Sequence, residues 1–473
     1  MQRSTFLKNL TLTGLGLLTQ QLTNAGYISS YTTADVMYYT KQDAKYHILR
    51  KGFNKRINNY PDVIALCHNT AGVAAAVLYA KQRNLPITVK SGGHCMEGYS
   101  CTNGGMVINL SLLNNITVHS NNTITVGPAA TLKQIYETLL PQGKYLPGGS
   151  CQSVAIGGLT LGGGYGILSR TYGLTCDSLL QATVVDGGGN IINTTTDAEL
   201  LWACKGGGNN NFGTITSMSF TVYNAPSTLK SYKFRVQKVS IPAAVDMCKQ
   251  WFEAVRNLPN SCFSAFIYNG RTTYILLTHT GGSNAIIQKF VTQFKNQSTK
   301  YTEGATLPLA TALKAYYAEA NPITFKNASA GLYKSYAQVE QVLEQVFTTI
   351  SKSSGILYQV NTLGGAIQNA GKEGSSSFAH RDCTYFSELQ AYWESASVTP
   401  KILAAFEAVQ QLFAKHGITA QYRNYPDANF NNYEQLYYGK NLTRLKAIKK
   451  KYDPNNMYRG GHSITAYPSG YSF

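Results

Sequence analysis

The hydrophobic pattern near the start of the chain changes period in a regular order. An apolar run at 63–67 is followed by Asn69 and Thr70, residue types that favour a helix N-terminus. An alanine-rich stretch comes next, and Pro86 separates it from a second apolar run at 87–90. This order predicts a strand, a helix and a second buried strand, which together form a β-α-β unit.

The pattern of the remaining chain predicts a change of architecture along its length. Short alternating strands are expected from about 106 to 222, with a hairpin at 179–195 around a glycine turn. Glycine becomes rarer from about 226 to 415, where helical and strand patterns mix. This change in glycine content and hydrophobic pattern indicates a second domain.

Length and charge restrict the class of protein. The 473 residues exceed what one hydrophobic core usually holds, so two domains are expected. Lys and Arg number 41 against 23 acidic residues, and the net charge of +18 favours anionic partners. No nucleic-acid motif accompanies this charge, so a solvated basic surface is the simpler explanation. Several lysines fall in the last turns of a predicted helix that buries Leu442, Leu445 and Ile448 and ends before Pro454.

The N-terminus has the pattern of an export signal. Arg3 and Lys8 precede a modest apolar run at 10–18, and small residues follow near Ala25. We therefore predict a secretory signal peptide at 1–25 and a secreted or extracytoplasmic protein, with an ordinary N-terminal helix as the alternative. No apolar run reaches the length of about 20 residues that a transmembrane helix needs.

The nine cysteines show no C-x-x-C pair, so the usual zinc-ribbon spacing is absent. Cys95 and Cys101 are close enough in sequence to bridge across a loop, and the odd total leaves at least one cysteine unpaired. Glycosylation sequons occur at Asn115, Asn193 and Asn327, although an asparagine-rich chain produces such sequences by chance.

A Gly-Gly-His turn follows the second predicted strand. The sequence Ser91–His94 leaves the carboxyl end of that strand, where open α/β sheets tend to bind ligands. Three interpretations compete: a plain turn, a metal site and a cofactor clamp. The metal site is disfavoured because no second ligand lies at a recognised spacing from His94.

Two later segments, at 147–177 and 199–222, are dense in glycine. The run Gly157–Gly166 can be fitted to G-x-G-x-x-G, but no helix is expected to open there within a β-α-β frame. No phosphate-loop sequence is present either. Glycine allows backbone N–H groups to approach a ligand closely. So much glycine therefore predicts a bed for a large, flat cofactor that carries two phosphates.

Five motifs together resemble one family. They are SGGH at 91–94, PGGSCQSVAIGGLTLGGGYG at 147–166, LLWACKGGGNNNFGTITSMSF at 200–220, YRNYPD at 422–427 and YYGKNLTRLKAIKKKYDPNNMYRGGHSI at 437–464. In this order they resemble the berberine-bridge-enzyme-like FAD-linked oxidases of the vanillyl-alcohol-oxidase superfamily. The resemblance covers nearly the whole chain after the leader.

The resemblance implies an α+β fold in three consecutive parts. Residues 26–225 would form a two-part FAD-binding domain of the vanillyl-alcohol-oxidase type. Residues 226–415 would form an α/β substrate domain with an antiparallel sheet covered by helices. Residues 416–473 would return to the FAD-binding domain.

The resemblance also implies a bicovalent FAD. His94 would bond the 8α-methyl group of the flavin and Cys151 would bond C6, so that two loops pin one edge of the ring. Double attachment would raise the reduction potential. The other implied cofactor-binding residues are Ser91, Gly92, Gly93, Val154, Gly157, Gly158, Gly213 and Asn441. The chain departs from the family at Cys95, where Asp or Ser is common, and at His462, where Gln is common.

The catalytic residues are inferred in the same way. Tyr425 would be the base that removes a proton while hydride leaves an alcohol carbon, and Tyr165 would share a hydrogen bond with it. A phenol titrates near 10 in water, so a lysine or arginine is expected to favour deprotonation. Glu388 would orient a substrate hydroxyl, with Gln390 on the same strand face. Val154 would leave room for dioxygen beside the flavin. The alternatives are a packed aromatic at Tyr425 and a salt-bridged glutamate at Glu388.

The function predicted from these residues is a flavin-dependent oxidase of CH–OH donors. Its substrate would be a mono- or oligosaccharide hydroxyl, and dioxygen would be reduced to hydrogen peroxide. The alternatives are a dehydrogenase that passes electrons to a quinone, an oxidase of alkaloid or phenolic alcohols, and a catalytically silent basic protein that binds surfaces. No metal ion, nucleic acid or transmembrane segment is predicted, and the sequence does not determine the oligomeric state.

Overall fold

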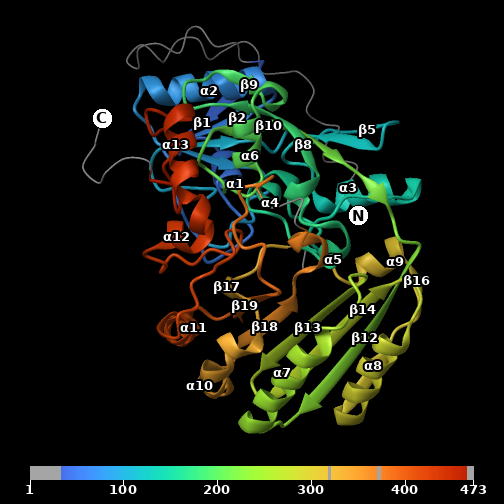
Figure 1. The fold of residues 1–473 in the computed structure, drawn as a ribbon. Helices are drawn as coiled ribbons and strands as arrows, with labels where there is room; N and C mark the ends of the chain where they lie inside the picture. Colours follow the sequence, from blue (N-terminus) through green and yellow to red (C-terminus); the bar gives the residue numbers. More distant parts are fainter. Residues whose placement is uncertain (1–33, 318–320, 370–373, 466–473) are drawn as a thin grey trace.

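The computed structural model describes residues 34–317, 321–369 and 374–465. The signal peptide predicted at 1–25 lies outside these residues. The described chain forms three main sheets. The first two lie in one half of the molecule, and the third, with its covering helices, fills the other half (Figure 1).

The first sheet contains the β-α-β unit that the hydrophobic pattern predicts. Its elements are β1 (Val36–Tyr39), α1 (Tyr46–Leu49), β2 (Val63–Cys67), α2 (Thr70–Gln82), β3 (Ile87–Lys90) and β4 (Met106–Asn109). The strand order is β1-β2-β4-β3, with β2, β4 and β3 parallel and β1 antiparallel at the edge. Asn69 caps α2, because its side chain accepts a hydrogen bond from the Gly72 N–H at 2.9 Å.

The second sheet is antiparallel and carries the two glycine-dense segments. Its strands are β5 (Ile116–His119), β6 (Thr123–Val126), β8 (Leu179–Val185), β9 (Ile191–Asn193) and β10 (Thr214–Thr221). Their order is β5-β6-β10-β8-β9, and β8 with β9 forms the predicted hairpin. The connecting elements are α3 (Leu132–Leu139), β7 (Lys144–Tyr145), α4 (Ile156–Leu161), α5 (Ser169–Tyr172), α6 (Ala198–Cys204) and β11 (Tyr223–Asn224), which pairs with β7.

Helix α4 lies at the start of the glycine run. It begins at Ile156, so a short helix is present although the sequence predicted none within a β-α-β frame. The strands on either side of it, β7 and β8, have only antiparallel partners. The β-α-β frame of a dinucleotide fingerprint is therefore missing, as expected.

The third sheet is antiparallel and has helices packed against it. Its strands are β12 (Thr228–Gln237), β13 (Cys262–Asn269), β14 (Thr272–Thr280), β15 (Lys300–Glu303), β16 (Leu307–Pro308), β17 (Phe325–Tyr333), β18 (Ile356–Thr362) and β19 (Tyr385–Tyr392). The main order is β15-β12-β14-β13-β18-β19-β17, and β16 also pairs with β12. The helices are α7 (Ile241–Val255), α8 (Ala285–Gln297), α9 (Leu309–Lys314), α10 (Glu340–Ser351) and α11 (Thr399–Lys415). This arrangement confirms the predicted α+β fold class.

Strand alternation separates an apolar face of the third sheet from a polar one. On β19, Leu389 and Ala391 enter the hydrophobic core with α7, α10 and α11. The residues of opposite parity, such as Glu388 and Gln390, therefore face away from that core. The same parity places polar side chains of β17 and β18 beside Glu388: Asn327, Gln359 and Asn361.

The C-terminal segment packs against the first half of the molecule. It contains α12 (Tyr433–Tyr438) and α13 (Leu442–Tyr452), and α13 lies close to α6 (Figure 1). Leu445 and Ile448 join the core under the second sheet, as the lysine-rich helix pattern predicts. Lys449 differs from the expected solvated lysines, because it is fully buried and bonds the Asp453 carboxylate at 2.6 Å.

All nine cysteines are free in the structure, so the bridge considered between Cys95 and Cys101 is not formed. Within the described ranges, no helix is both long enough and apolar enough to cross a membrane.

A buried ion cluster joins three segments that are far apart in sequence. The Lys326 ammonium on β17 lies 2.7 Å from a Glu97 oxygen and 2.8 Å from an Asp427 oxygen. Arg56 bonds the other Glu97 oxygen at 2.7 Å, and Gln410 donates to the other Asp427 oxygen at 3.0 Å. Glu97 follows the Gly-Gly-His turn and Asp427 ends the YRNYPD motif, so this cluster fixes both segments against β17.

We expect Lys326→Met to destabilise the fold strongly. The substitution leaves two buried carboxylates without their shared cation, which typically costs about 3–5 kcal/mol. The change is measurable as a lower midpoint of urea denaturation. Lys334→Met is the matched control, because Lys334 and Asp382 form an ion pair with both side chains more than 60% exposed. Equal midpoints for the two variants would show that the cluster does not hold these segments.

Candidate active site

A cavity of about 350 Å³ lies where the halves of the molecule meet. Its wall includes twelve of the thirteen residues that the sequence analysis assigned to the site: Ser91, Gly92, Gly93, His94, Cys151, Val154, Gly157, Gly158, Tyr165, Gly213, Glu388 and Tyr425. The exception is Asn441, whose side chain donates to the Ser377 carbonyl at 3.1 Å away from the cavity wall. Four of the five motifs therefore converge on one site, although they are up to about 330 residues apart, and the fifth, at 437–464, contributes no lining residue.

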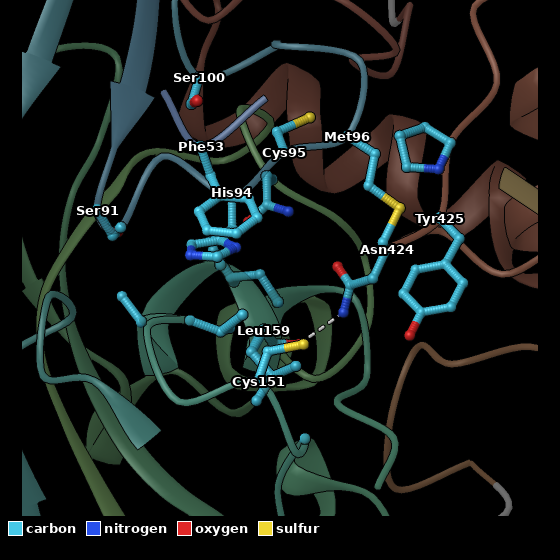
Figure 2. A pocket seen from close by; sticks show the side chains of 18 of the residues that line it. Phe53, Ser91, His94, Cys95, Met96, Ser100, Cys151, Leu159, Asn424 and Tyr425 are labelled. Atoms are coloured by element: carbon cyan, nitrogen blue, oxygen red, sulfur yellow. Dashed lines mark hydrogen bonds between the residues drawn. The ribbon is translucent and has the colours of Figure 1, made fainter. Parts of the chain in front are cut away.

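The His94 ring is held from two sides. It stacks on Phe53 with 4.1 Å between ring centroids (Figure 2). Its Nε2 lies 3.0 Å from the Ser153 hydroxyl. The Phe53 N–H also donates to the Gly93 carbonyl at 3.0 Å, which fixes this loop against the turn. Burial lowers the pKa of His94 to about 4, so the imidazole is neutral at physiological pH.

The two glycines of the turn serve different purposes. Gly93 has a φ of +71°, a conformation that favours glycine. A Cβ at Gly92 would come within 2.9 Å of the Ala155 Cβ. Gly92 therefore lets the His94 turn touch the segment that carries Cys151, rather than only leaving space for a cofactor.

Cys151 faces the same cavity from a second loop (Figure 2). Burial raises the pKa of its thiol, and the Glu388 carboxylate raises it further. Cys151 is therefore a thiol rather than a thiolate in the structure. The cavity therefore presents a neutral imidazole and a thiol, which becomes a nucleophile when it loses its proton.

The composition of the wall fits a large cofactor. Backbone at Gly158 borders open space, because a Cβ added there would meet only Asn209 Oδ1, at 3.6 Å. The wall combines polar groups such as Glu388 with apolar side chains such as Val89, Leu110 and Ile215. A cavity lined by glycine backbone, apolar side chains and a few polar groups suits a large molecule such as FAD.

Glu388 is clamped by two carboxamides. Asn327 on β17 and Asn361 on β18 each donate to a different Glu388 oxygen, both at 3.2 Å. The side chain is 5% exposed, and this burial raises its pKa to about 7 although the amide bonds oppose the shift. Glu388 can therefore exchange a proton near neutral pH. Within the part of the chain that the structure describes, Glu388 bonds amides and forms no salt bridge.

Tyr425 lies in the cavity wall. Burial raises the pKa of Tyr425 well above its usual value, and the Glu388 charge raises it further. The other groups with the largest effects on this pKa are Tyr422, Cys151 and Tyr165, and none of them is a cation. The Tyr165 hydroxyl donates its hydrogen bond to the Thr362 carbonyl at 2.7 Å rather than to Tyr425.

Sequence analysis missed several residues of the wall or its support: Phe53, Ser153, Asn327, Asn361 and Arg423. The two asparagines share the strand parity of Glu388, but the pairing of their strands is needed to use that signal. Asn327 was noted only as a sequon. It lies buried on β17 and bonds Glu388, which makes it an unsuitable glycosylation site.

Comparisons with known proteins agree with this geometry. A family model described as an FAD binding domain matches residues 61–195, and one described as berberine and berberine like matches residues 421–465. The chain is 29% identical over 457 residues to the FAD-linked oxidoreductase YvdP of Bacillus subtilis, covering 92% of this chain and 99% of the relative. It is 27% identical to the glucooligosaccharide oxidase of Sarocladium strictum, covering 92% and 93%.

A solved structure supports the fold. BBE-like 1 of Physcomitrella patens superimposes with a TM-score of 0.83 at 23% identity, covering 91% of this chain and 97% of that one. The two family models lie on the His94 and Cys151 segments and on the Tyr425 segment, which are the segments that meet at the cavity. The chain therefore carries an FAD binding domain and a berberine-like segment, is similar over about nine-tenths of its length to berberine-bridge-enzyme-like proteins, and is an FAD-linked oxidoreductase.

Proposed function

We propose that this protein is an oxidase that removes hydride from an alcohol carbon of a mono- or oligosaccharide. The observation that carries the proposal is the amide-clamped Glu388, which shares one cavity with His94 and Cys151. Bound FAD supplies the hydride acceptor and passes the electrons to dioxygen, which becomes hydrogen peroxide. His94 and Cys151 would hold the cofactor covalently, one from each loop.

Glu388 is the better proton acceptor at neutral pH. Its pKa of about 7 leaves a large fraction ionised, whereas Tyr425 stays protonated because its pKa is raised well above the usual value. We therefore infer that Glu388 takes the proton of the substrate hydroxyl and that the Tyr425 phenol orients this hydroxyl. This assignment exchanges the roles that the family resemblance implied for the two side chains.

The polar groups near Glu388 support a carbohydrate substrate. Asn327, Gln359 and Asn361 line the cavity from two strands, and the buried Asn327 Oδ1 accepts no hydrogen bond from the residues that the structure describes. Carboxamides offer both donors and acceptors, as a sugar with several hydroxyl groups requires. Tyr392 and Phe325 add aromatic surface to the same wall. The glucooligosaccharide oxidase among the relatives is named for a substrate of this class.

Val154 supports the choice of dioxygen as electron acceptor. It lines the cavity three residues after Cys151 and has a small, branched side chain. By the family resemblance this position lies beside the reactive part of the ring, where a small side chain leaves room for dioxygen.

We expect reducing oligosaccharides to bleach the flavin under anaerobic conditions and to release peroxide in air. Oxidation of an anomeric hydroxyl would give a lactone. A panel of oligosaccharides and phenolic alcohols, monitored by flavin absorbance and by a peroxide assay, tests this. Bleaching by sugar without peroxide in air would identify a dehydrogenase instead. Turnover of phenolic alcohols alone would overturn the carbohydrate assignment.

The rate of anaerobic flavin reduction should rise with pH through about 7, because ionised Glu388 is the form that accepts a proton. Glu388→Gln should lower this rate by roughly 10²- to 10⁴-fold and abolish the rise with pH. Stopped-flow absorbance at saturating substrate measures both effects. Tyr425→Phe should reduce the rate but keep the pH dependence. A profile that disappears in Tyr425→Phe and persists in Glu388→Gln would return the base role to Tyr425.

Acid precipitation should leave the yellow cofactor on the wild-type protein and on the single variants His94→Ala and Cys151→Ala. Each single variant keeps one bond, so turnover slows while the flavin stays attached. The double variant should release all of its flavin to the supernatant. Cys204→Ala is the control, because Cys204 is buried outside the cavity. Flavin that stays on the precipitated double variant would refute this pair of attachment sites.

A further inference from the structure

Arg423 is a buried cation in the cavity wall without an acidic partner. Its side chain is 5% exposed, and its Nε donates to the Tyr438 hydroxyl at 3.1 Å. Nη2 donates to the His462 carbonyl at 3.2 Å, and the guanidinium lies over the Tyr437 ring at 5.4 Å. Among the residues that the structure describes, no carboxylate forms an ion pair with it. A buried charge that lacks a counter-charge is costly, so an anion is expected at this point.

The two departures from the family pattern meet at this side chain. Cys95 stands where the family often has Asp or Ser, and burial raises the pKa of its thiol, so it carries no charge. His462 stands where Gln is common, and burial together with the Arg423 charge lowers its pKa to about 3. Neither neighbour therefore neutralises Arg423. An aspartate at position 95 would do so.

The guanidinium lies against the second glycine-dense segment. A Cβ at Gly208 would come within 3.1 Å of its Nε. Asn210 in that segment donates to the Tyr99 carbonyl at 3.0 Å, which joins it to the loop after His94. Arg423 therefore lines the cavity where the second glycine-dense segment meets the C-terminal segment that carries His462.

We propose that Arg423 is the counter-charge for the diphosphate of FAD. The diphosphate is the charged part of the oxidised cofactor and separates its flavin from its adenosine. A guanidinium donates two parallel hydrogen bonds to phosphate oxygens, which makes arginine well suited to this contact. Cys95 and His462 keep the position free of negative charge, which leaves the arginine available to the cofactor. The inference rests on FAD as the occupant of this cavity and not on the nature of the substrate.

The test distinguishes a contact to the diphosphate from a contact to the flavin ring by comparing two ligands. In a His94→Ala, Cys151→Ala background, the dissociation constants of FAD and riboflavin are measured by fluorescence titration of the flavin-free protein. Riboflavin carries the ring without the diphosphate. Adding Arg423→Met should weaken FAD binding about 10- to 100-fold and leave riboflavin binding unchanged. Equal losses for both ligands, or no loss for FAD, would overturn the proposal.

A matched pair at position 95 provides the test if Arg423→Met does not fold. Cys95→Asp should weaken FAD relative to riboflavin, because it neutralises the guanidinium, whereas Cys95→Ser should not. Equal behaviour of the two variants would also overturn the proposal. A lower flavin reduction potential in Cys95→Asp with unchanged FAD affinity would place the contact at the ring and exclude the diphosphate. Covalent flavin retained in the background variant would instead show that His94 and Cys151 are not the attachment sites. Failure of the attachment assignment can therefore be distinguished from failure of the Arg423 assignment.

Discussion

The ion cluster of Lys326, Glu97 and Asp427 is the constraint on which the site depends. It joins the turn that carries His94, the strand β17 and the segment that carries Tyr425 at one buried point. Buried charges must keep their partners, so these segments cannot separate without exposing the cluster or leaving a charge unpaired. The third sheet is thereby fixed against the segments that carry His94 and Tyr425. The geometry of the cavity follows from this connection.

The alternation of side chains along the strands of the third sheet places polar groups in the cavity. One face of β17, β18 and β19 fills a hydrophobic core, and the other presents amides and one carboxyl group to the cavity. Burial keeps His94 neutral and raises the pKa of Glu388 to about 7. Both effects have the same cause, which is the cost of placing a charge away from water. A neutral nucleophile and a carboxylate that can exchange a proton therefore coexist in one cavity.

Local patterns predicted much of the fold and most of the wall. The β-α-β unit, the hairpin of β8 and β9 and the buried face of α13 follow from hydrophobic period, caps and glycine turns within short windows. The site residues followed from motifs whose order resembles a family. The amide clamp on Glu388, the contact between Gly92 and Ala155, and the bond from Tyr165 to the Thr362 carbonyl could not be predicted in this way. Each depends on contacts between segments far apart in the chain.

We propose that His94 and Cys151 each form a covalent bond to one FAD in this cavity. The intact mass of the denatured wild-type protein tests this attachment most directly. Electrospray mass spectrometry in acid, followed by peptide mapping, should show the chain plus one FAD, less the hydrogens displaced by two bonds. The modified peptides should contain His94 and Cys151. A mass equal to that of the unmodified chain, or flavin on any other residue, would contradict the account.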